Sequence, residues 1–75
     1  MPQTAKLLAI ELNKYLDEME APINVRERAN ILSKILNIPK QQAWGLLEGQ
    51  VLPDPALREK LLNELEIDMD GLSDS

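Results

Sequence analysis

The stretch from Ala29 to Gly49 restricts the fold of this 75-residue chain more than any other. Two short segments with helical spacing of apolar residues meet at Asn37-Ile38-Pro39, which leaves no room for a flexible connection. Asn37 stands where a helix must end, and asparagine tolerates the left-handed backbone that such an end often needs. Pro39 cannot continue the first helix but suits the first turn of a second one. The sequence therefore predicts a helix-turn-helix, with its two helices steeply crossed, at residues 25–49.

Two helices are predicted from start signals and apolar stripes in the first half of the chain. The first should run from Thr4, as its N-cap, to about Met19. Its apolar side consists of Leu7, Leu8, Ile10, Leu12, Tyr15, Leu16 and Met19. Asn24 followed by Glu27 is typical of a capping box, which predicts a second helix from Val25 to Leu36. Its buried side should hold Val25, Ala29, Leu32 and Leu36, broadened by Ile31 and Ile35.

The second half of the chain is predicted in the same way. The third helix should span residues 40–47 and end at Gly49. Asp54-Pro55 is a strong start signal for a fourth helix that runs to about Glu66. Its apolar positions are Leu57, Leu61, Leu62 and Leu65. A short further turn should follow, with Ile67 and Leu72 packing back, and residues 73–75 should form a loose tail.

The composition agrees with an all-α protein, a compact bundle of four to five helices in one domain of residues 1–75. The chain has one Trp, one Tyr and no Phe, so its core must be aliphatic. No cysteine is present, which excludes disulfides and thiolate zinc sites and agrees with a reducing compartment. The apolar run Leu7–Ile10 is too short for a signal or membrane segment. We expect a soluble, cytoplasmic protein that does not contact a membrane.

Catalytic chemistry is not indicated. The chain has no histidine, no cysteine and no glycine-rich phosphate loop, and its carboxylates are scattered along helix surfaces. Asp68-Met69-Asp70-Gly71 is similar to the opening of a calcium loop, but the later ligands that such a loop requires are missing. We therefore expect no enzyme, no cofactor and no metal site.

The net charge of −5 argues against nucleic-acid binding, but the charges are unevenly distributed. Between Ile23 and Leu52 four basic residues face two acidic ones. From Pro53 onward two basic residues face seven acidic ones. The only basic third of the chain is therefore the one that contains the predicted helix-turn-helix.

This same stretch resembles the DNA-binding core of the lambda repressor-like helix-turn-helix regulators of prokaryotes and phages. The residues that match the family pattern are Leu32, Ser33, Leu36, Asn37, Ile38, Ala43 and Leu46. The continuation Leu46-Leu47-Glu48-Gly49, then Pro53 and an amphipathic helix, also matches, so the resemblance covers residues 25–72. The chain departs from the pattern at Ala29, Asn37 and Pro39, where Gln, Gly and a Ser or Thr cap are common.

The resemblance implies a small sequence-specific transcriptional regulator whose third helix lies in the major groove of double-stranded DNA. The family pattern places Lys40, Gln41, Trp44 and Gly45 toward DNA, with Gln42 at the margin. Glutamines can form two hydrogen bonds with an adenine edge. Arg26, Arg28 and Lys34 on the second helix are the expected phosphate contacts. Regulators of this kind usually act as dimers, and the apolar residues near the C-terminus, Ile67, Met69 and Leu72, predict the dimer surface.

Other interpretations of the same residues stay open at this stage. The polar side chains of the third helix could be an ordinary solvated face. Trp44 is either a contact anchor or a cover over Leu52 and Pro53. Gly45 serves a close approach, either of the DNA backbone or of a packed neighbour. The alternative function is a helix-turn-helix scaffold used as a protein-protein interaction module or inhibitor, through its acidic surface and Trp44.

Overall fold

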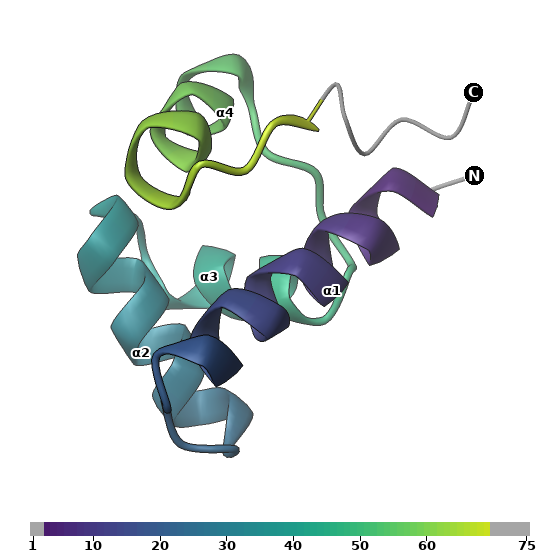
Figure 1. Ribbon diagram of the computed structural model, residues 1–75. Coiled ribbons are helices and arrows are strands. Elements are labelled where there is room, and N and C mark those ends of the chain that lie inside the picture. The colour runs from purple at the N-terminus through teal and green to yellow at the C-terminus, as the bar shows by residue number, and fades with distance from the viewer. Residues whose placement is uncertain (1–2, 70–75) are drawn as a thin grey trace.

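The chain forms four α-helices in the part that the structure describes, residues 3–69 of a computed structural model (Figure 1). They are α1 (Gln3–Glu18), α2 (Val25–Leu36), α3 (Lys40–Leu47) and α4 (Pro55–Lys60), and α4 continues into a π-helical turn, η1 (Leu61–Leu65). No strand occurs among these residues. The predicted all-α class is confirmed.

The core is aliphatic, as predicted, and every helix contributes to it. Its fully buried large side chains are leucines from α1, α2, α3 and η1: Leu8, Leu12, Leu16, Leu32, Leu36, Leu46 and Leu61. Trp44 and Tyr15 are only partly buried and pack against the edge of this cluster. The Cα radius of gyration is 11.2 Å, close to the value of about 11 Å expected for a compact chain of this length.

Helix α1 differs from its prediction at both ends. It includes Gln3, so Thr4 lies inside the helix and is not its N-cap. Met19 follows the last helical residue and is exposed, and Ile10 is 59% exposed. The exposure of Ile10 follows from the burial of Ala5 and Ala9, because α1 approaches its neighbours on the side of these small residues.

The connection between α2 and α3 is as tight as predicted. The side chain of Asn24 caps α2 by accepting a hydrogen bond of 2.7 Å from the backbone N–H of Arg26. Asn37 ends α2 in the left-handed conformation, with φ of 56°, and the N–H of Ile38 donates to the Ser33 carbonyl at 3.0 Å. Pro39 then occupies the N-cap of α3 in an extended conformation.

The left-handed conformation recurs at the other helix ends. Glu20 follows α1 with φ of 60°, Gly49 follows α3 with φ of 70°, and Glu66 follows η1 with φ of 58°. A hydrogen bond across five residues accompanies it at α1, from the N–H of Ala21 to the Leu16 carbonyl at 2.9 Å. These are Schellman-type ends, which satisfy carbonyl groups that the helix itself leaves unpaired.

The fourth helix begins as predicted but changes its winding. Asp54 caps α4 by accepting a hydrogen bond of 2.8 Å from the N–H of Leu57. The helix widens at Leu61, which keeps Leu57, Leu61 and Leu65 on the core side. Leu62 is 49% exposed, so its predicted burial is wrong. The reason is that Leu57, Leu61 and Leu65, spaced four residues apart, cover the side of the helix that faces the core. Leu62 is one residue beyond Leu61 and lies outside that side.

The segment after η1 closes the core. Ile67 packs back as predicted, and Met69 is buried as well. The predicted dimer surface is therefore wrong for Ile67 and Met69, because their side chains already belong to the core of their own chain. Leu72, the rest of the predicted further turn and the tail at 73–75 lie outside the described residues.

Candidate nucleic-acid interface

The start of α3 presents polar side chains on a fixed support. Lys40 and Gln41 are exposed and Gln42 is half-buried. Ala43, Leu46 and Leu47 on the other side of the helix are buried, and they pack α3 against α2 and α1. In Figure 1, α1 crosses in front of α3. Because α1 and α2 both pack against α3, its first turn is a fixed platform for its polar residues.

The N-terminus of α3 has no side-chain cap. Pro39 stands at the N-cap and makes no side-chain hydrogen bond there. The first intrahelical bond runs from the N–H of Ala43 to the Pro39 carbonyl, at 3.1 Å. The N–H groups of the first turn therefore point along the helix axis beside Lys40, an arrangement that favours an anionic group.

Gly45 makes room for a neighbour in the same chain. A Cβ atom placed on Gly45 would lie 3.1 Å from one methyl group of Val51 and 3.3 Å from the other. The N–H of Gln50 also donates to the Gly45 carbonyl at 2.9 Å. Of the two interpretations left open for Gly45, these contacts match the packed neighbour. The predicted contact of Gly45 with DNA loses its reason, because Val51 fills the space.

Trp44 is half-buried and packs against the core cluster. Part of its ring is therefore committed to the fold, and only the remaining part is available to another molecule. The indole therefore packs α3 against the core in addition to the neighbouring Ala43.

Arg28 is not available to a phosphate, so that prediction is wrong. The residue is 6% exposed. Its Nε donates to the Pro22 carbonyl at 2.6 Å, and its Nη1 donates to Oδ1 of Asn13 at 2.9 Å. Its Nη2 pairs with the carboxylate of Asp17. The guanidinium thus joins α2 to α1 and to the loop between them.

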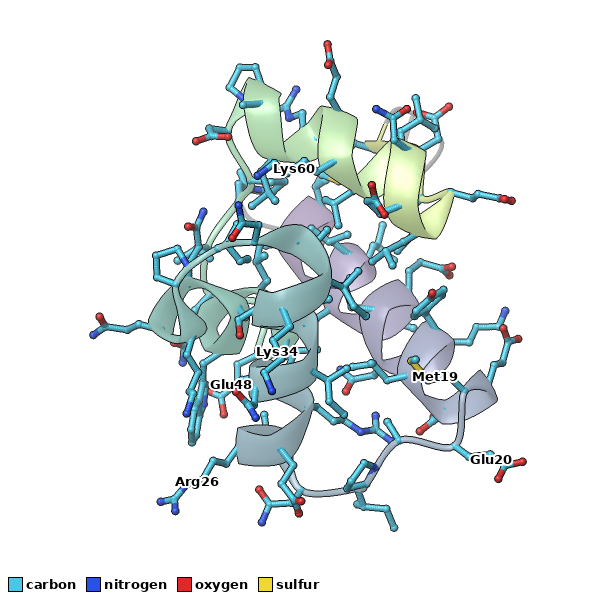
Figure 2. The ribbon with its side chains drawn as sticks, turned by 90° about the vertical axis from the view of Figure 1, so that its left-hand side faces the viewer. Met19, Glu20, Arg26, Lys34, Glu48 and Lys60 are labelled. Carbon is cyan, nitrogen blue, oxygen red and sulfur yellow. The ribbon has the colours of Figure 1, made fainter. Side chains whose placement is uncertain are left out.

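The other predicted phosphate contacts are exposed. Arg26 extends away from the ribbon, and Lys34 lies on the outer side of α2 (Figure 2). Glu48 at the C-cap of α3 is also exposed. The exposed members of the predicted set are therefore Lys40, Gln41, Arg26 and Lys34, and Gln42 and Trp44 are half-buried.

A hollow adjoins the start of α3 that sequence reasoning did not identify. Its volume is about 420 Å³. It is lined by Pro39, Gln41 and Gln42 at the start of α3 and by Val51 and Leu52 of the loop after α3. The signal in the sequence was the apolar pair Val51-Leu52 within a loop, where polar residues are more usual.

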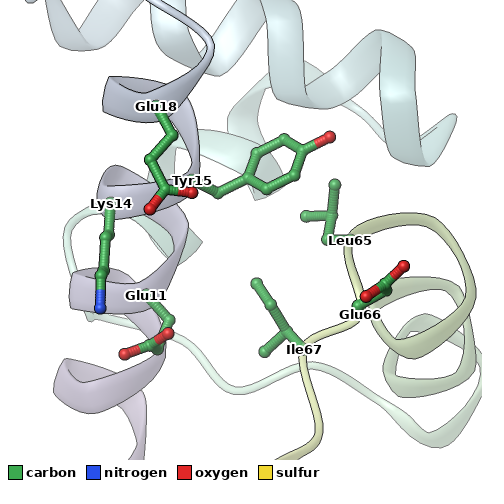
Figure 3. A pocket seen from close by; sticks show the side chains of 7 residues that line it. All are labelled: Glu11, Lys14, Tyr15, Glu18, Leu65, Glu66 and Ile67. Atoms are coloured by element: carbon green, nitrogen blue, oxygen red, sulfur yellow. The ribbon is translucent and has the colours of Figure 1, made fainter.

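A second hollow, of about 230 Å³, lies between α1 and η1 (Figure 3). Three glutamates surround it, Glu11 and Glu18 from α1 and Glu66 after η1, together with Lys14. The acidic charge of the chain thus gathers partly on a surface built by α1 and η1, and not at the start of α3.

The sequence did not predict two sets of hydrogen bonds from side chains to backbone carbonyl groups. The amide nitrogen of Asn13 donates to the Ala9 carbonyl at 2.8 Å and to the Leu47 carbonyl of α3 at 3.3 Å. The Lys60 ammonium donates to the Leu36 carbonyl at the end of α2, at 3.1 Å. A single Asn or Lys on a helix gives no periodic signal, so the spacing of residues could not predict these hydrogen bonds.

Comparisons with protein-family models, with curated proteins and with solved structures give no match. Within residues 3–69, no helix is both long and apolar enough to cross a membrane. No group of three or more acidic side chains in that range is arranged to hold a metal ion.

Proposed function

We propose that this chain is a small sequence-specific DNA-binding regulator. In this proposal α2, the turn at residues 37–39 and α3 act as a helix-turn-helix, and α3 enters the major groove. The observation that carries the proposal is the uncapped start of α3, where Lys40 and Gln41 project from a helix whose opposite side is fully buried. Side chains on the first turn of such a helix are the ones that reach base edges.

The phosphate contacts in this proposal come from both helices. Lys40 and the N–H groups beside it would hold one phosphate, and Arg26 and Lys34 are the exposed cations of α2. Arg28 has no such role, because its guanidinium is bound within the fold. With so few cations we expect modest affinity and a shallow dependence of affinity on salt concentration.

An amide chemical-shift titration with random-sequence duplex DNA at low and moderate salt tests the proposal. We expect shifts at residues 40–45 and around Arg26 and Lys34 of α2, growing as salt is lowered. No shift at either salt concentration would overturn the proposal.

Two variants with the same change of charge make the test specific. Lys40→Ala should weaken binding and reduce the log-log salt slope by about one unit. Lys14→Ala removes the same charge from α1, beside the α1–η1 hollow, and should leave the slope nearly unchanged. Equal effects of the two substitutions would indicate that DNA is attracted by the overall charge and that α3 does not dock on it, which would count against the proposal.

The alternative, a protein-binding module, is favoured by one observation. Three glutamates and one cation, Lys14, line the hollow of Figure 3, and this excess of negative charge suits a basic side chain of a partner. A chain with this function would show no chemical-shift change at α3 with DNA. It would instead shift at Tyr15 and Ile67 when a lysine- and arginine-rich peptide is added.

A further inference from the structure

The loop that follows α3 is fixed in position by α3 itself. Val51 packs into the space above Gly45, and the N–H of Gln50 is bound to the Gly45 carbonyl at 2.9 Å. Pro53, two residues later, is buried. Leu52 lies between these two fixed points and is 50% exposed. The backbone at Leu52 is therefore held between two packed neighbours, and its side chain lies on the surface.

Val51 and Leu52 of the loop and Gln41 and Gln42 of α3 line the same hollow beside α3. The hollow thus combines an apolar surface with two amide side chains that can both donate and accept hydrogen bonds. Two partly exposed aliphatic side chains next to these amides form a surface suited to a ligand that has both an apolar and a polar group side by side.

An A·T base pair carries that combination on its major-groove edge. Adenine presents N7 and the N6 amino group, which a glutamine can bind with two hydrogen bonds, and thymine presents its C5 methyl group. A G·C pair has no methyl group there. We infer that the hollow receives a thymine methyl group against Leu52 while a glutamine of α3 binds adenine, so that Leu52 helps to select A·T pairs. This inference rests on the proposed function and adds to it the kind of sequence that is read.

The test begins with selection of bound duplexes from a random library by the intact chain. The selected duplex is then remade with deoxyuridine in place of thymidine, one position at a time, which removes a single methyl group and leaves the hydrogen-bonding edge unchanged. We expect one position at which affinity falls about threefold to fourfold, the effect of withdrawing one methyl group from an apolar contact.

Two leucine variants assign the contact. Leu52→Ser should bind the thymidine duplex as weakly as the wild-type chain binds the deoxyuridine duplex, and should no longer distinguish the two. Leu62→Ser is the matched control, because Leu62 is 49% exposed but lies on η1, outside this hollow. It should keep the full methyl effect.

The possible failures are distinct. If the wild-type chain retains no duplex at all, the proposed function is overturned and the inference with it. If duplexes are retained but deoxyuridine is tolerated at every position, DNA binding stands and the inference is overturned. If Leu52→Ser keeps the methyl effect, another side chain contacts the methyl group and the role given to Leu52 is wrong.

Discussion

Arg28 of α2 and Asn13 of α1 are joined by a hydrogen bond of 2.9 Å from Nη1 to Oδ1. The amide nitrogen of the same Asn13 donates to the Leu47 carbonyl of α3 at 3.3 Å. One asparagine therefore connects the buried guanidinium of α2 to the C-terminal end of α3. This connection holds the three helices that position the candidate interface.

Replacing Arg28 should destabilise the fold strongly. Arg28→Ala leaves the Pro22 carbonyl and the Asn13 side chain without their donor, so we expect a loss of about 2–3 kcal/mol in the free energy of unfolding. Urea denaturation followed by circular dichroism measures it. Arg26→Ala, two residues away and exposed, is the control and should stay within about 0.5 kcal/mol of the wild type. Equal losses for the two variants would contradict the structural role.

The ion pair itself should contribute little to that loss. The side chain of Asp17 is 65% exposed, so solvent screens its attraction to Arg28. We expect Asp17→Asn to cost less than about 1 kcal/mol in the same denaturation experiment. A loss as large as that of Arg28→Ala would mean that the charge, and not the hydrogen bonds to Pro22 and Asn13, holds the guanidinium.

Glu20 and Glu66 occupy backbone conformations that favour glycine. Both have positive φ at a helix end, where a Cβ atom is unfavourable. Glu20→Gly and Glu66→Gly should each stabilise the chain by about 0.5–1 kcal/mol, which thermal denaturation would register as a rise in Tm of several degrees. Glu20→Ala removes the same carboxylate but keeps the Cβ atom and should give no comparable gain. If Glu20→Ala stabilises the chain as much as Glu20→Gly, the cause is the loss of the carboxylate charge and not of backbone strain.

The two glycines that flank the end of α3 should respond differently to alanine. Gly49 has φ of 70°, and an added Cβ would lie 3.3 Å from the Cα of Lys6, so Gly49→Ala should cost at least about 1 kcal/mol. Gly45 is helical, and the atoms nearest to its added Cβ would belong to the side chain of Val51. Gly45→Ala should therefore stabilise by about 1 kcal/mol in a Val51→Ala background, through helix propensity, and by less in the wild type. Additive effects of Gly45→Ala and Val51→Ala on unfolding would exclude that contact.

Local signals predicted the helix boundaries around the candidate interface well. Asn24, Asn37 and Asp54 stand where the sequence placed them, because caps and left-handed ends depend on a few adjacent residues. The sites of Arg28 and Gly45 were not predictable in this way. Whether an arginine near a helix start faces solvent or the loop beneath it depends on contacts 6 to 15 residues away along the chain.

Dependence on contacts that are distant in sequence also explains the wrong predictions near the C-terminus. Ile67 was predicted both to pack back and to belong to a dimer surface, and only the first prediction holds. Met69 has no periodic partner in sequence, so it looked like a surface residue left over for a second copy, whereas it covers the core. The widening of the helix at Leu61 has no local signal such as a glycine or proline. It follows from the need to keep Leu57, Leu61 and Leu65 against the core, which is a tertiary requirement.

Glu48 offers a test of the candidate interface that does not depend on a particular target sequence. Its exposed carboxylate lies at the C-cap of α3, on the helix proposed to enter the major groove, where it would repel phosphates. Glu48→Lys should raise affinity for random duplex DNA by about tenfold at low salt, with a steeper salt dependence, because one repulsive charge becomes an attractive one. Glu64→Lys makes the same change of charge on the exposed surface of η1 and should raise affinity far less. Fluorescence anisotropy of a labelled duplex at several salt concentrations measures both variants. If the two gain equally, only net charge matters and α3 has no special place in the complex.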